Sequence, residues 1–251
     1  MSPRSSRRTF CRWSFGAALA AVGVAIGDGR SAFSAGRMRA PRIVARGPGE
    51  WGLLRIWSDG IDPERPAVVW VHGFNPFPNK VHFTLGEAAV ASGWSLRDLN
   101  LLEWDWNRAT RASLRPQVNV EAARGQGERL AASLIAVGVT PGRTELIGHS
   151  LGCVLVAAAA RSWCAQTGDR VRQVTLLEPL RGNHATIFDQ EQLASNADRV
   201  ENHWSPGLSG FGAPAARPGV IDDRRPGRTP ARGLLLPHRS NHVDVLRQYL
   251  K

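Results

Sequence analysis

The segment Gly148–Gly152 constrains the fold of this chain more than any other part of the sequence; it reads G-H-S-L-G. The short apolar run Thr144–Ile147 precedes it and predicts a strand, and the alanine-rich run Val154–Ala160 follows it and predicts a buried helix. A Cβ at either glycine position would collide with the neighbouring strand or helix if the turn between them is sharp. The pattern therefore predicts a tight strand-to-helix turn that presents the hydroxyl of Ser150.

Predicted strands and helices alternate from residue 67 onward. The continuous apolar run Ala67–Val71 suits a strand that is buried on both faces of a parallel sheet. Further strands are expected over 53–57, 100–106, 171–177 and 199–204, and further helices over 81–91, 120–137 and 241–250. This order predicts an α/β protein with a three-layer fold and a mainly parallel central sheet. The length of 251 residues suits one such domain.

The first 34 residues are expected to be an export signal and not part of the fold. Residues 6–10 read S-R-R-T-F, which matches the core of a twin-arginine signal. The apolar run over 15–26 is short and rich in glycine and alanine for a membrane span, and 32–34 is a small-x-small cleavage site. We therefore expect the export machinery of the twin-arginine route as a partner, a domain over 35–251, and a periplasmic or extracellular location. An uncleaved membrane anchor is the alternative.

The composition is basic, with a formal net charge of +11, and almost all of the positive charge is carried by arginine, since Lys80 and Lys251 are the only lysines. The arginines are scattered and no nucleic-acid-binding motif accompanies them. We therefore attribute the charge to an arginine-biased genome and expect no nucleic-acid partner. The sequence leaves the oligomeric state open.

Cysteine and histidine spacing predicts neither a disulfide nor a metal site. Cys153 and Cys164 lie eleven residues apart on one predicted helix, a span of roughly 16 Å that no disulfide can bridge. We expect both to be buried thiols. The seven histidines contain no H-x-x-x-H helix and no paired-cysteine arrangement. No metal or cofactor is therefore expected.

The segment over 205–238 is rich in glycine, proline and arginine and shows no periodicity. Long irregular stretches of this kind are either loops that line a site or surface insertions. A lid over the site and a surface insertion are both compatible with this composition.

A serine hydroxyl needs a base to accept its proton before it can act as a nucleophile. The favoured base is His242, at the start of the predicted final helix. His238 is its near rival, and His203 and His184 are weaker alternatives. Ser150 and His242 are the pair that the sequence predicts.

The base in turn needs a carboxylate to orient it. Glu178 follows the strand after the Ser150 helix, so it lies at the carboxyl end of a parallel strand, where catalytic groups gather. Pro179 ends that strand. Glu201 is the second choice, and Asp222 and Asp223 are further alternatives.

Two backbone N–H groups are needed to stabilise the oxyanion that forms during acyl transfer. The N–H of Leu151 lies at a helix N-terminus, where the helix dipole favours negative charge. The N–H of Phe74 is the second candidate, because Gly73 lets the loop after the 67–71 strand approach the site closely.

Four segments between residues 65 and 180 carry a family resemblance. They are Trp70–Phe74 (W-V-H-G-F), Asn100–Trp106 (N-L-L-E-W-D-W), Leu146–Gly152 (L-I-G-H-S-L-G) and Leu177–Pro179 (L-E-P). In type and order these segments resemble the α/β-hydrolase superfamily, and within it the pancreatic-type lipase branch. The resemblance implies Ser150 as nucleophile, Glu178 as acid, a later histidine as base, an oxyanion hole at Phe74 and Leu151, and carboxylic-ester substrates.

The chain also departs from that branch. The acid is a glutamate where those lipases have an aspartate, and their disulfides and carboxyl-terminal lipid-binding domain have no counterpart in this sequence. We expect an exported serine hydrolase that cleaves small-molecule or lipid esters through an acyl-enzyme on Ser150. The alternatives are a non-catalytic exported scaffold, acting as a binding or envelope protein, and a hydrolase of amides or peptides.

Overall fold

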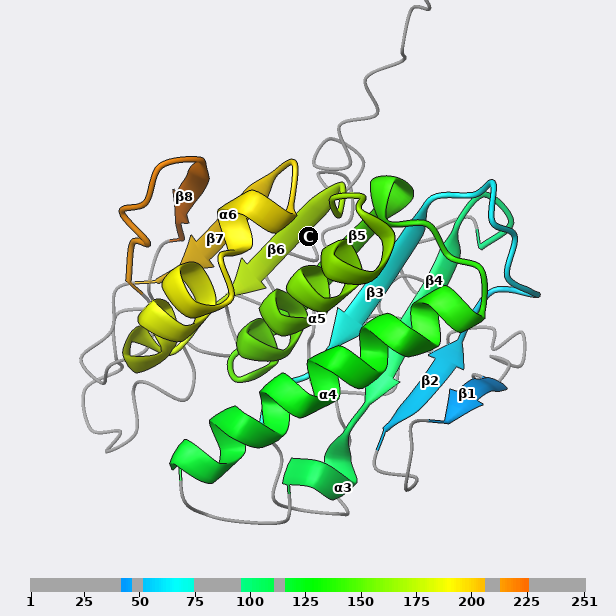
Figure 1. The fold of residues 1–251 in the computed structure, drawn as a ribbon, viewed down its shortest axis with the longest axis horizontal. Helices are drawn as coiled ribbons and strands as arrows, with labels where there is room; N and C mark the ends of the chain where they lie inside the picture. The colour runs from blue at the N-terminus through cyan, green and yellow to red at the C-terminus, as the bar shows by residue number, and fades with distance from the viewer. Residues whose placement is uncertain (1–41, 47–51, 75–95, 111–115, 206–212, 226–251) are drawn as a thin grey trace, which may run out of the picture.

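A computed structural model describes residues 42–46, 52–74, 96–110, 116–205 and 213–225. They form one eight-stranded sheet with the strand order β1-β2-β4-β3-β5-β6-β7-β8 (Figure 1). The strands are β1 (Arg42–Arg46), β2 (Leu53–Ile56), β3 (Ala67–Val71), β4 (Asn100–Asp105), β5 (Thr144–His149), β6 (Gln173–Leu177), β7 (Val200–Trp204) and β8 (Val220–Arg224). The α-helices are α3 (Asn107–Thr110), α4 (Pro116–Ala136), α5 (Gly152–Thr167) and α6 (Leu193–Asn196).

The sheet is parallel except at one edge. β1 pairs with β2 and β2 pairs with β4 in antiparallel fashion, whereas every pair from β4 to β8 is parallel. All five residues of the central strand β3 are buried, as its continuous apolar run predicts. The parallel strands bring their carboxyl ends to one edge of the sheet, which is where ligands bind in open α/β sheets.

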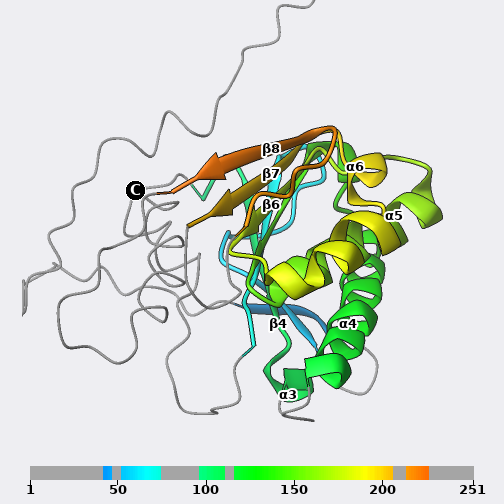
Figure 2. The ribbon, with the colours of Figure 1, turned by 90° about the vertical axis from the view of Figure 1, so that its left-hand side faces the viewer.

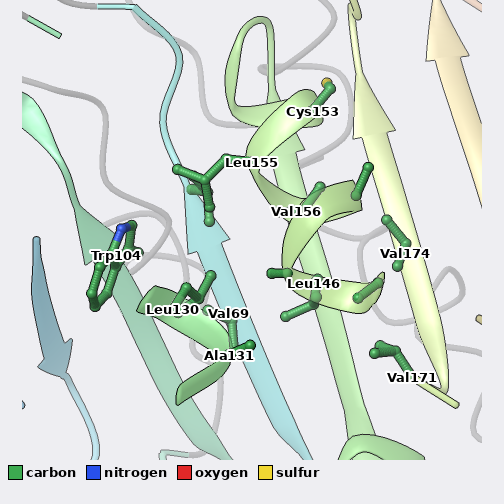
Figure 3. Close-up of a cluster of buried hydrophobic side chains, with 14 of the residues drawn as sticks. Val69, Trp104, Leu130, Ala131, Leu146, Cys153, Leu155, Val156, Val171 and Val174 are labelled. Atoms are coloured by element: carbon green, nitrogen blue, oxygen red, sulfur yellow. The ribbon is translucent and has the colours of Figure 1, made fainter. Parts of the chain in front are cut away.

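Helices α4, α5 and α6 cover one face of this sheet, as the side view shows (Figure 2). The main hydrophobic core lies between them and the sheet and includes Val69, Leu146 and Val156 (Figure 3). α4 packs closely on α5 at Gly127, where the lack of a side chain permits the approach. A Cβ at this position would lie 2.5 Å from the carbonyl oxygen of Leu155. The central strands are therefore covered on this side by two closely packed helices.

The opposite face of the sheet carries a second, smaller cluster of buried side chains. It consists of Val68, Trp70, Leu99, Leu101, Ile147 and Leu177. Burial on both faces explains why the inner strands read as continuous apolar runs rather than as alternating ones. Among the residues that the structure describes, no helix is long and apolar enough to cross a membrane.

The predicted α/β fold with a mainly parallel sheet is confirmed, and the predicted strands from residue 53 to residue 204 are present with small shifts of their ends. The predicted helices over 81–91 and 241–250, and the predicted signal over 1–34, lie outside the described residues. The helix expected from residue 120 begins earlier, at Pro116. Cys153 is buried as expected, but Cys164 is only half-buried.

The expectation that 205–238 is irregular throughout was wrong for one part of it. Residues Val220–Arg224 form β8, which pairs in parallel with β7. As an edge strand, β8 needs no continuous apolar run, and its two aspartates and its arginine conceal its periodicity. β1, at the other edge, was not predicted either.

Candidate active site

Ser150 occupies the tight turn between β5 and α5, as the G-x-S-x-G pattern predicts. Its φ is +55°, a left-handed conformation that residues other than glycine adopt rarely. Its N–H donates to the carbonyl oxygen of Leu177 at the end of β6 (2.9 Å), and its own carbonyl accepts from the N–H of Cys153 in the first turn of α5 (3.0 Å). The surrounding structure thus holds Ser150 in a strained conformation, and such strain concentrates at functional sites.

The two glycines of the pattern are required by close contacts. A Cβ on Gly148 would lie 2.6 Å from the carbonyl oxygen of Gly152, on the first residue of α5. A Cβ on Gly152 would lie 2.7 Å from the carbonyl oxygens of both Val71 and His72. The predicted collision with a neighbouring strand or helix is therefore confirmed at both positions.

The loop after β3 lies directly against the serine. A Cβ on Gly73 would lie 2.8 Å from the Cβ of Ser150 and 3.0 Å from the carbonyl oxygen of His149. Phe74, the next residue, is partly exposed, with 36% of its surface accessible. Leu151 follows Ser150 directly at the N-terminus of α5, where the first N–H groups have no intrahelical acceptor. The structure thus brings the segments of both predicted oxyanion donors to the serine.

This proximity makes Gly73→Ala a sensitive variant. The added methyl group must displace the loop or the serine, so we expect the rate of any acyl transfer at Ser150 to fall by about 10²–10³-fold, the effect of losing one oxyanion donor. Steady-state kinetics checks this. Gly125→Ala, on α4, is the matched control, because a Cβ there meets no atom within 4 Å. Equal activity of the two variants would contradict the placement of the loop in the site.

Two residues that the sequence argument did not assign hold this loop. The indole N–H of Trp106 donates to the carbonyl oxygen of His72 (2.9 Å), and the two rings stack 5.8 Å apart. The neighbouring Asp105 pairs with Arg55 across β4 and β2 (2.5 Å). Burial opposes ionisation of Asp105, but the facing His72 ring, the N–H of Asn107 and the charge of Arg55 outweigh it and lower the pKa of Asp105 well below its usual range. The motif D-W was visible in the sequence, but nothing there indicated that it anchors the loop.

Glu178 lies one residue beyond the end of β6, beside the serine turn. It is buried, with 1% of its surface exposed, and its φ is +52°. Its N–H donates to the carbonyl oxygen of His203 on β7 (2.9 Å), and its carboxylate accepts the N–H of Ser205. Since Leu177 accepts the N–H of Ser150, Glu178 is tied to the same edge of the sheet as the serine.

The alternative acids make other contacts. Glu201 binds His203 (2.9 Å) and Arg199 (2.5 Å). The hydrogen bond from His203 is the main cause that lowers the pKa of Glu201 to about 2, and burial opposes it. Asp223 pairs with His203 (3.0 Å) and with Arg225 (2.7 Å). Both carboxylates therefore belong to a charge cluster that joins β7 to β8.

Asp222 is engaged with the chain before β8. Its carboxylate accepts the side-chain N–H of Asn202 (2.7 Å) and the backbone N–H groups of Ala215 (2.8 Å) and Ala216 (3.1 Å). These bonds tie Ala215 and Ala216 to β8 and join β8 to β7, so Asp222 stabilises the fold at this edge of the sheet.

The structure describes two of the four candidate bases, His203 and His184. His242 and His238 lie outside the described residues. His203 contacts carboxylates through both ring nitrogens, and His184 packs edge-on against Phe188 at 5.5 Å. Burial lowers the pKa of His184. Within the described residues, no group of three or more His, Cys, Asp or Glu side chains could hold a metal ion.

No family model matches this chain, and no curated protein matches it. Among solved structures, it is similar to a thermophilic esterase from the Planctomycetes species Thermogutta terrifontis, with 14% identity, a TM-score of 0.45, and coverage of 85% of this chain and 92% of that one. The same esterase phosphorylated by paraoxon gives 12% identity, a TM-score of 0.47, and coverage of 85% and 94%. A puromycin-hydrolyzing peptidase from Mycobacterium tuberculosis gives 19% identity, a TM-score of 0.45, and coverage of 83% of this chain and 38% of that one.

At these identities and TM-scores the likeness does not bear on activity, so any functional argument rests on the geometry around Ser150. The strand order, the parallel sheet and the glycine-bounded serine turn at its carboxyl edge define the architecture. The chain has an α/β-hydrolase fold.

Proposed function

We propose that this protein is a serine hydrolase with Ser150 as its nucleophile. One observation carries the proposal: Ser150 is held at φ +55° on the turn between β5 and α5, with the Gly73 loop packed against its Cβ. A serine with a purely structural part has no need of this strained turn, nor of the two glycines that permit it. The arrangement is that of a nucleophile elbow facing an oxyanion loop.

The proposed substrates are carboxylic esters. The Oγ of Ser150 attacks the ester carbonyl while a histidine, for which His242 is the candidate, accepts its proton. The N–H groups of Phe74 and Leu151 stabilise the oxyanion of the tetrahedral intermediate. The histidine then gives its proton to the leaving alcohol, which departs as the acyl-enzyme forms. Water, activated by the same histidine, releases the carboxylic acid and restores the serine.

Glu178 is the proposed acid that orients this histidine. It is buried at the edge that carries the serine, and its carboxylate is set by the N–H of Ser205. Its three rivals are engaged in the contacts around β7 and β8 described above. The positive φ of Glu178 turns the chain sharply after β6. Its side chain is longer than that of the aspartate found in the pancreatic-type lipases by one methylene group.

A fluorophosphonate probe tests this function. Such a probe forms a stable adduct only with a serine activated by a base and an oxyanion hole. We expect stoichiometric labelling of the purified full chain and hydrolysis of short-chain aryl esters. A folded protein that the probe does not label would instead favour the non-catalytic scaffold. An aryl amide panel run in parallel separates esterase from amidase activity.

We further propose export by the twin-arginine route, on the S-R-R-T-F sequence of residues 6–10. The signal is an address read by a receptor, so replacing both Arg7 and Arg8 by lysine is expected to retain the protein in the cytoplasm although the charge is kept. Cell fractionation measures this, with Arg12→Lys as the control. Undiminished export of the double variant would show that this sequence is not the signal.

A further inference from the structure

The imidazole of His72 makes contacts that the reaction above does not use. The ring is buried, with only 5% of the residue exposed, and its Nδ1 lies 2.7 Å from the carbonyl oxygen of Gly73. A carbonyl oxygen can only accept a hydrogen bond, so Nδ1 must carry a proton and donate it. His72 thereby holds the carbonyl group of the residue that packs against Ser150.

This bond fixes more than the carbonyl. The peptide group that joins Gly73 to Phe74 is planar and trans, so its C=O and its N–H point in opposite directions. Holding the oxygen of Gly73 toward the His72 ring therefore turns the N–H of Phe74 away from that ring. The direction of the proposed oxyanion donor is thus fixed through the carbonyl group that His72 binds.

The His72 ring is fixed on its other side as well. Its Nε2 accepts a hydrogen bond from the backbone N–H of Trp106 (3.3 Å), and Trp106 also binds the carbonyl oxygen of His72 through its indole N–H. A half-turn of the imidazole would lose the contacts of both nitrogens. The end of β4 therefore clamps the ring that in turn holds the loop.

We propose that His72 is a positioning residue that orients the N–H of Phe74 for oxyanion stabilisation. The proposal rests on the function proposed above and adds a residue to it. His72 acts through the peptide group that joins Gly73 to Phe74. Trp106, just after β4, acts in turn by holding His72 through its two hydrogen bonds.

Two substitutions separate the hydrogen bond from the bulk of the ring. His72→Asn keeps an N–H donor near the position of Nδ1, whereas His72→Leu keeps apolar volume and removes the donor. We expect His72→Leu to lower kcat and kcat/KM together, by about tenfold to a hundredfold, with KM little changed, because the lost interaction is made in the transition state. His72→Asn should stay within about threefold of the wild type, since the donor is retained.

The affinity for a boronic acid provides a measurement that would not change if His72 only stabilised the fold. Phenylboronic acid bonds to the Oγ of an activated serine and places a boronate oxygen where the oxyanion forms. For His72→Leu its affinity should fall by the same factor as kcat/KM, whereas affinity for a carboxamide that mimics the ground state should not change. Equal weakening of both ligands would overturn the proposal.

The chain offers a matched pair of tryptophans on β4 and just after it. Trp106→Phe keeps an aromatic ring and removes the indole N–H that binds His72. Trp104→Phe makes the same change two residues earlier, where the indole N–H donates to Gln126 on α4 (3.2 Å). Both side chains are fully buried. We expect a severalfold loss of kcat for Trp106→Phe and none for Trp104→Phe. Equal losses in the two variants would contradict the proposal that Trp106 holds His72 in place.

The outcomes distinguish this inference from the function on which it rests. A wild-type protein that neither reacts with a fluorophosphonate nor cleaves esters would overturn both. Normal wild-type reactivity with an unchanged labelling rate for His72→Leu would overturn only the part given to His72. The nitrogen chemical shifts of His72 in the ¹⁵N-labelled protein provide a test without activity, in which a ring without a proton on Nδ1 would also overturn it.

Discussion

Replacing Ser150 by alanine is expected to abolish fluorophosphonate labelling and to lower kcat by about 10⁵-fold or more, the scale seen when a nucleophile is removed from a triad. The fold should not change, because alanine meets the same positive φ as serine at this turn and only a hydroxyl is lost. Ester hydrolysis measured at matched folded concentration, checked by circular dichroism, provides the comparison.

Ser133→Ala is the control for this experiment. Ser133 lies on α4 and is also buried, but it belongs to the helical layer rather than to the serine turn. We expect wild-type labelling for this variant. Labelling that survives in Ser150→Ala would place the reactive serine elsewhere and remove the basis of the proposed function.

Replacing Glu178 by glutamine is expected to lower kcat by about 10³–10⁴-fold, because a neutral amide neither selects the required histidine tautomer nor stabilises the imidazolium. The side-chain oxygen that accepts the N–H of Ser205 is kept, so the turn after β6 should remain. Steady-state kinetics and the rate of fluorophosphonate labelling should fall together, while the melting temperature changes little.

Glu201→Gln is the matched control for the acid. Glu201 is a partly buried carboxylate that contacts a histidine, but the histidine is His203 of the β7–β8 charge cluster. We expect this variant to have a lower melting temperature and a kcat close to that of the wild type. The opposite result, with Glu201→Gln inactive and Glu178→Gln active, would transfer the part of the acid to Glu201.

Local patterns in the sequence were sufficient for most of the sheet. The apolar run of β3, the strand before Ser150 and the helix after it are each recognisable alone, because burial on both faces leaves a continuous apolar signature. The edge strands β1 and β8 were missed for the complementary reason. An edge strand is partly solvated and is defined by its pairing with a neighbour, which the residues V-I-D-D-R of β8 do not reveal.

The candidate site shows the same division. The glycine spacing around Ser150 identifies the turn, and the order of segments places Glu178 at the end of the next strand. The sequence favours Glu178 over Asp222 because only Glu178 follows a predicted strand, but it does not reveal what either carboxylate contacts. In the structure, Asp222 accepts hydrogen bonds from the side chain of Asn202 on β7 and from the N–H groups of Ala215 and Ala216, contacts that the sequence pattern does not reveal.

The sequence by itself therefore determined the α/β class, through the alternation of strands and helices along the chain. It also determined the serine turn and the glycine-containing loop after β3, because each is encoded by residues adjacent in the chain. Only the tertiary structure decided which groups hold that loop. His72 and Trp106 are 34 residues apart, and their hydrogen bonds exist because β3 and β4 pair in parallel and end at the same edge. Contacts of this kind depend on strand order and register, and a linear pattern contains neither.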